Sequence, residues 1–175
     1  RMYGNVGIGV TPETSHTSVT SLQIGGLSNL ISTTAQSAGS STWLGNNVYV
    51  NSSGAQAYIV TDEASVIRQV GGEHYFQVAS SGTADAGISF TTAMIVKNNG
   101  NVGIGTTSPD TKLRVEGDIT LHTEDNSASS NPQLNFKRST NSVDNNDSIG
   151  KINFYGEDSI GDSTLYADIF TEIQV

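Results

Sequence analysis

One six-residue motif, Gly-Asn-Val-Gly-Ile-Gly, occurs twice in this chain, at residues 4–9 and again at 100–105. Its valine and isoleucine lie two residues apart and are expected on one side of a strand, while the glycines present bare backbone on the other. A strand of this kind lets another backbone approach closely. A proline follows each copy, at Pro12 and Pro109, and ends pairing because it has no N–H to donate. The duplication indicates a repetitive, elongated protein, of which this chain is expected to be a fragment.

The two copies are the candidate structural site of the chain. Their residues are Gly4, Asn5, Val6, Gly7, Ile8, Gly9, Gly100, Asn101, Val102, Gly103, Ile104 and Gly105. The repeat extends beyond them, because the short alternating stretches 22–24 and 112–116 follow the prolines and both end at glycine. The predicted order is motif, proline turn, short strand, glycine. A side chain at Gly103 is expected to collide with the backbone that passes it.

Composition favours strands and turns over helices around a large core. Only 35% of the 175 residues are hydrophobic and 7% aromatic, with three prolines and abundant Gly, Ser, Thr and Asn. The formal net charge is −9 and no basic cluster occurs, so nucleic acid is excluded as an expected partner. Cysteine is absent, and no apolar run approaches the roughly 18 residues of a membrane span, so no membrane insertion is expected.

The pattern between the two motifs predicts an all-β fold. Brief apolar stretches alternate with Gly/Asn/Ser turn clusters. The predicted strands lie at 27–31, 43–44, 48–50, 57–60, 66–70, 75–78, 88–90 and 94–96. No segment keeps apolar positions at helical spacing over three capped turns.

The C-terminal third predicts further strands at 119–121, 134–136 and 152–154. Leu165 to Val175 fits either a strand face or a helical stripe, and we favour a strand. The predicted organisation has three parts: 1–26 as the end of a preceding repeat, 27–111 as a full repeat, and 112–175 as the truncated start of another.

Three stretches together carry a resemblance to a known class of proteins. Residues 99–117, Asn-Gly-Asn-Val-Gly-Ile-Gly-Thr-Thr-Ser-Pro-Asp-Thr-Lys-Leu-Arg-Val-Glu-Gly, resemble a recurrent shaft motif of bacteriophage tail fibres and spikes. The motif is found upstream of endosialidase-type intramolecular chaperone domains. Similar elements of such fibres are recognised in 44–49, 71–76 and 88–94, and in 149–156 with 166–169.

The resemblance implies an elongated fibre segment of short strands and loops, an intertwined homotrimeric rod on the virion. The implied function is that of a structural shaft, not an enzyme, which displays or contributes to attachment to a host surface glycan or receptor. The self-cleaving serine and lysine of the chaperone have no counterpart here. Two alternatives stay open: a polysaccharide-degrading tail spike with paired carboxylates in a groove, and a bacterial cell-surface adhesin with fibre-like repeats.

The shortness of the strands also favours an oligomer, independently of the resemblance. Short strands bury too little apolar surface to offset the conformational entropy lost when they are ordered. Four aromatic residues, Trp43, Tyr49, Tyr58 and Tyr75, could form a sugar-stacking surface, although packing between strands explains them better. No catalytic residue, cofactor or metal site is predicted. The three histidines are far apart in sequence, and the motif lacks the third glycine of a dinucleotide-binding loop.

Overall fold

A computed structural model describes residues 4–35, 37–124, 132–137, 148–157 and 163–172. The chain divides into two compact units, residues 1–119 and residues 120–175, and each is described by itself. The described residues form strands, turns and loops without a helix, so the predicted all-β class is confirmed. The predicted boundaries after residues 26 and 111 both fall inside the first unit, and its sheet continues across them.

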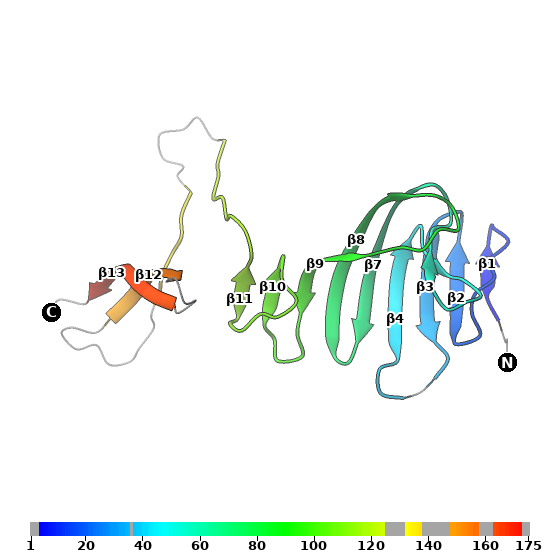
Figure 1. Ribbon diagram of the computed structural model, residues 1–175, viewed down its shortest axis with the longest axis horizontal. Coiled ribbons are helices and arrows are strands. Elements are labelled where there is room, and N and C mark those ends of the chain that lie inside the picture. Colours follow the sequence, from blue (N-terminus) through cyan, green and yellow to red (C-terminus); the bar gives the residue numbers. More distant parts are fainter. Residues whose placement is uncertain (1–3, 36, 125–131, 138–147, 158–162, 173–175) are drawn as a thin grey trace. The chain divides into compact units, whose positions relative to one another are not determined.

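The first unit is built on one open sheet of nine strands, ordered β1-β2-β3-β4-β7-β8-β9-β10-β11 (Figure 1). Neighbours are antiparallel except at the two motifs, where β1 pairs with β2 and β10 with β11 in parallel. The strands are β1 Val6–Ile8, β2 Val19–Ile24, β3 Ser28–Thr33, β4 Ser41–Asn46, β7 Asp62–Val70, β8 Glu73–Gly82, β9 Thr91–Val96, β10 Val102–Ile104 and β11 Leu113–Val115.

Two central strands are longer than the sequence pattern indicated. β7 has nine residues and β8 ten, because the chain stays extended through Ser80-Ser81-Gly82, which had the composition of a turn. Conversely, the strand predicted at 88–90 is wrong. Ile88 and Phe90 pack from an irregular segment onto the cluster of Tyr58, Ala64 and Ala79. The alternating apolar side chains of this segment therefore pack onto the cluster, and the segment is not a strand of the sheet.

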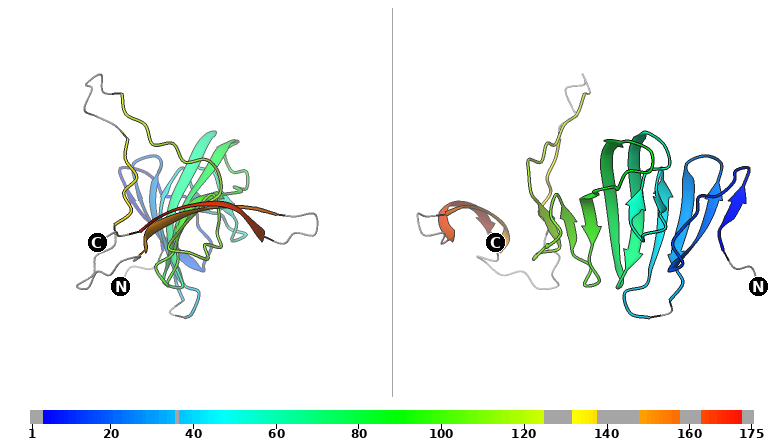
Figure 2. Two further views of the ribbon diagram at one scale, coloured as in Figure 1. Left: turned by 90° about the vertical axis from the view of Figure 1, so that its left-hand side faces the viewer. Right: turned by 45° about the vertical axis from the view of Figure 1, so that its right-hand side comes forward.

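One face of the sheet is covered by the chain itself. The small hairpin of β5 (Tyr49–Val50) and β6 (Gln56–Ala57), together with the segment that leads from β8 to β9, lies across it (Figures 1 and 2). Residues at alternate positions of the strands point beneath this cover and are buried, among them Ile31, Trp43, Val66 and Ile95. This side is called the covered face, and it contains the hydrophobic core of the unit.

Asn47 joins the cover to the sheet. Its side chain is fully buried, donates to the carbonyls of Val60 and Glu63 at 3.1 and 2.9 Å, and accepts the amide of Val60 at 2.9 Å. Its backbone has φ 56°, a conformation that asparagine tolerates better than most residues. One side chain therefore fixes both ends of the segment that connects β4 to β7.

Replacing Asn47 by alanine is expected to lower the free energy of unfolding by about 2–4 kcal/mol, because three hydrogen bonds are lost and buried backbone groups are left unpaired. Urea denaturation of the Asn47→Ala variant measures this. Asn98, whose side chain is exposed, provides the control, since Asn98→Ala should stay within about 0.5 kcal/mol of the parent. Equal destabilisation by both variants would contradict this role of Asn47.

Among the described residues of the second unit, β12 (Ser148–Glu157) and β13 (Ser163–Glu172) form an antiparallel hairpin. The strand predicted at 152–154 is confirmed, and so is the preference for a strand over a helix from Leu165 as far as Glu172. The strands predicted at 119–121 and 134–136 are wrong, because neither segment has a pairing partner among the described residues. A two-stranded hairpin is only marginally stable by itself.

Candidate functional site

The uncovered face of the nine-stranded sheet carries a continuous row of apolar side chains, called here the apolar row. Strand register places one member on each strand, each directly opposite the next. Its members, from β1 to β11, are Val6, Leu22, Leu30, Leu44, Ile67, Phe76, Met94, Ile104 and Val115. Exposure alternates along each strand as a result. Leu44 is 58% exposed, whereas its neighbour Trp43 on the covered face is 8% exposed.

This face is also free of charge. Apart from the bulged start of β7, none of its paired positions holds Asp, Glu, Lys or Arg. The positions beside the apolar row are Ile8, Ile24, Ser28, Asn46, Ser65, Val78 and Thr91 on one side, and Thr20, Ser32, Thr42, Gln69, His74, Val96, Val102 and Leu113 on the other. In a chain with a net charge of −9, a charge-free face of this extent is what the centre of a protein interface has.

The middle of the face is hollowed. A depression of about 470 Å³ is lined by Leu44, Ile67, Phe76 and Val78, with smaller polar side chains around them. Because its walls are mainly apolar and open to solvent, it suits a complementary apolar side chain of another molecule. Sequence alternation indicated the apolar positions of single strands, but only the register shows that they form one row.

The two motif copies have the same geometry at opposite ends of the sheet. In each, the asparagine side chain donates to a backbone carbonyl eight residues further on: Asn5 to Glu13 at 2.8 Å and Asn101 to Pro109 at 3.2 Å. The last glycine has φ +72° in the first copy and +73° in the second, a region that glycine enters without strain. The predicted order of motif, turn and short strand is confirmed for both copies.

A backbone does pass close to Gly103, and it belongs to the same chain. A Cβ at this position would lie 2.5 Å from the carbonyl oxygen of Thr106 and 3.1 Å from a methyl of Ile95. At Gly7 a Cβ would likewise meet the carbonyl oxygen of Val10, again three residues further on. The glycine is therefore required so that the chain can fold back under its own strand.

Gly103→Ala is expected to lower the free energy of unfolding by about 1–3 kcal/mol, because the Thr106 carbonyl must move to admit a methyl group. Gly7→Ala should act in the same direction. Differential scanning calorimetry of the variants measures the effect.

Gly26→Ala is the matched control for these two substitutions. No atom lies within 4 Å of a Cβ at Gly26 and its φ is ordinary, so alanine should be neutral or stabilise by up to about 1 kcal/mol. If Gly103→Ala melts no lower than Gly26→Ala, the close approach is not what the motif requires.

The four aromatic residues proposed for sugar stacking lie on the covered side. Trp43, Tyr49 and Tyr58 are each at most 8% exposed, and their polar atoms bond to Ser41, Asp85 and the Ser80 carbonyl. Burial and the Asp85 carboxylate raise the pKa of Tyr49 to about 12. Tyr75 is half-buried and donates to Glu73 at 2.6 Å. With the rings of the first three buried, their faces are used in packing, not in a sugar platform.

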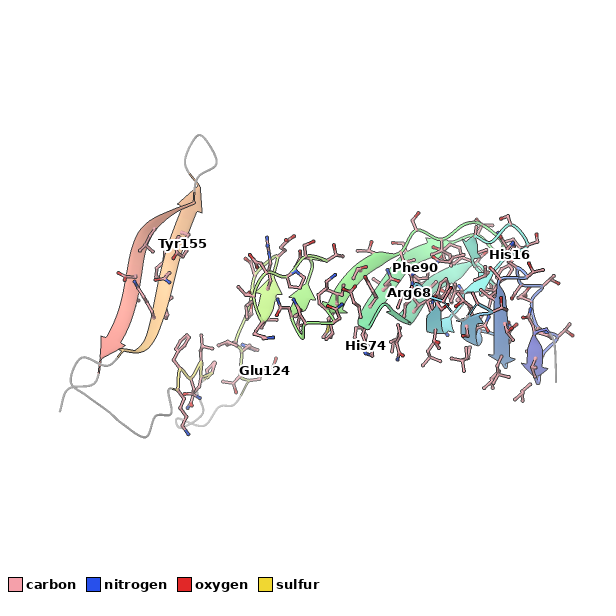
Figure 3. All side chains as sticks on the ribbon, turned by 90° about the horizontal axis from the view of Figure 1, so that it is seen from below. His16, Arg68, His74, Phe90, Glu124 and Tyr155 are labelled. Carbon is pink, nitrogen blue, oxygen red and sulfur yellow. The ribbon has the colours of Figure 1, made fainter. Side chains whose placement is uncertain are left out.

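Charged groups of the central strands gather on the covered side. The Arg68 guanidinium lies 5.5 Å from the Trp43 ring centre and 6.0 Å from that of Tyr75. Figure 3 labels Arg68 among the side chains of the nine-stranded sheet. Strand pairing brings Lys97, directly after β9, beside Glu73 at the start of the neighbouring β8, and the two form an ion pair of 2.6 Å. The Lys97 ammonium and the Tyr75 hydroxyl together hold the pKa of Glu73 below its usual value. Lys97 is thereby fixed at the start of the turn that leads into the second motif.

In the part of the chain that the structure describes, His, Asp and Glu side chains do not come together in a group of three able to hold a metal ion. Among the same residues, no helix is long and apolar enough to cross a bilayer. Neither a protein-family model nor a curated protein matches the chain.

Proposed function

We propose that this chain is a segment of a bacteriophage tail fibre or spike, a homotrimeric β-rich shaft on the outside of the virion. The proposal assigns it a structural role in presenting, or contributing to, attachment to a host surface glycan or receptor, with no catalytic step. The observation that carries its self-association is the charge-free apolar row across all nine strands. The number of chains and the viral setting rest on the resemblance of the motif sequences.

The apolar row lacks a covering layer in the single chain. Leu30, Leu44, Ile67 and Ile104 are each at least 40% exposed, and burying the free half of such a side chain contributes about 1 kcal/mol. Summed over the row this gives on the order of 5–10 kcal/mol per chain, comparable with the roughly 4–15 kcal/mol cost of association. Copies of the same face that meet along an axis would supply this cover.

The second unit has the same deficit. On its hairpin Ile152 lies opposite Ile169, and Phe154 opposite Ala167, so that apolar side chains share one face. Phe154 and Ile169 are 50% and 58% exposed. Two units that each leave an apolar strand face uncovered support a protein whose core is completed by further chains.

Sedimentation velocity at micromolar concentration tests the proposal. The parent chain is expected to be a stable trimer. Ile67→Asn, in the middle of the apolar row, should weaken assembly by more than about tenfold, since roughly 1–2 kcal/mol of burial is lost per chain. Leu44→Asn should act alike.

The control is Gln69→Asn, on the same strand and the same face but beside the row. This change removes one methylene from a polar position and should leave the sedimentation coefficient unchanged. A parent chain that sediments as a monomer throughout this range would contradict the proposal, as would equal loss of assembly in Gln69→Asn and Ile67→Asn.

A further inference from the structure

The first motif leaves one edge of its strand open, whereas the second motif does not. β10 has two neighbours, β9 on one side and β11 on the other. β1 has the same sequence but only one neighbour in the described structure, β2, and so forms the edge of the sheet (Figure 1). The second copy therefore shows which kind of strand fits the open side of the first.

On the occupied side of β10 the partner is antiparallel and apolar. Val102, Gly103 and Ile104 lie opposite Val96, Ile95 and Met94. Lys97 donates its amide to the Asn101 carbonyl at 2.8 Å, and Gly105 donates to the Ala93 carbonyl at 3.0 Å. Antiparallel alternation then directs the N–H and C=O of Gly103 towards Ile95. Four backbone groups of the second motif are satisfied in this way.

The other side of each motif is used identically. Gly25 donates to the Ile8 carbonyl at 2.9 Å, and Glu116 donates to the Ile104 carbonyl at 2.9 Å. The groups that face outwards from β1 are therefore the Asn5 carbonyl, both polar groups of Gly7 and the Gly9 amide. An edge of this kind is a template for a further strand.

The geometry points to one occupant: an antiparallel strand of the β9 type in the same polypeptide, directly N-terminal to Arg1. Arg1-Met2-Tyr3-Gly4-Asn5 aligns with Lys97-Asn98-Asn99-Gly100-Asn101, with a basic residue first, glycine fourth and asparagine fifth. In the second copy these five residues form the tight connection from β9 into the motif, closed by a Gly100 amide to Lys97 carbonyl bond of 2.9 Å. Successive repeats would thus extend one continuous sheet.

This inference concerns the edge of the sheet and not its apolar face, so it holds or fails independently of trimer formation. A strand added at β1 would place apolar residues opposite Val6 and Ile8, as Val96 and Met94 lie opposite Val102 and Ile104. Such a strand lengthens the uncovered face without interrupting its pattern.

Amide hydrogen exchange of the full chain tests the inference. Three proteins are compared: the parent, the parent with Thr-Thr-Ala-Met-Ile-Val fused before Arg1, and the same extension with proline in place of its isoleucine. In the parent, the Gly7 and Gly9 amides should exchange fast while those of Gly103 and Gly105 are protected. The extension should slow Gly7 and Gly9 by about tenfold or more. The proline control should not, since proline cannot donate to the ladder.

Two results would overturn the inference. One is exchange of Gly7 in the extended protein as fast as in the parent, which would show that the edge does not accept the strand. The other is protection of Gly7 in the parent at the level of Gly103. If that protection rises with protein concentration, a second copy occupies the edge. If it does not, the edge is already closed within the chain.

Discussion

The carbonyl oxygen of Thr106 occupies the space that a side chain at Gly103 would need, and the rest of the sheet depends on this contact. It allows the chain to turn beneath the strand that it has just formed and to return as a parallel neighbour after residues 105–112, a shorter connection than the dozen or more residues usual for parallel strands. The same device recurs at Gly7. Each motif therefore places two adjoining strands at its end of the sheet, and the antiparallel strands fill the space between them.

The turn after each motif also determines which face of the sheet is left uncovered. Because the chain folds back on the glycine side, the valine and isoleucine of each motif are left on the opposite, uncovered face. The hairpin held by Asn47 also lies on the glycine side. All covering segments thus lie on one face of the sheet. The other face is left apolar, free of charge apart from the bulged start of β7, and exposed to solvent. An arrangement of this kind is stable when further chains supply the missing layer.

Several features of the fold could be predicted from the sequence because they depend on local chemistry. Alternation in Leu22-Gln23-Ile24 and the proline after each motif were sufficient to place the repeat. Other features depend on long-range pairing. The segment Ile88 to Phe90 alternates like a strand but packs on Tyr58 as cover, and Ser80-Ser81-Gly82 continues a strand because β7 supplies a partner. The apolar row could not be predicted, since it exists only once the register of nine strands is known.

For the candidate glycan contacts the sequence favoured packing between strands over a sugar surface, and the rings of Trp43 and Tyr58 are buried. The segments that cover these rings depend on long-range pairing and could not be predicted. For the motif, the sequence indicated a close backbone approach at Gly103, but not that the approaching backbone comes from three residues away in the same chain.

Hydroxyl-radical footprinting read by mass spectrometry tests most directly whether further chains cover the apolar row. Leu44 and Val60 are 58% and 40% exposed in the single chain, but only Leu44 belongs to the row. Side-chain protection follows burial, so in the native protein Leu44 should be modified more slowly than Val60, reversing the order that their exposures in the single chain predict. Faster modification of Leu44 than of Val60 would show that the row stays open to water, and would contradict assembly through this face.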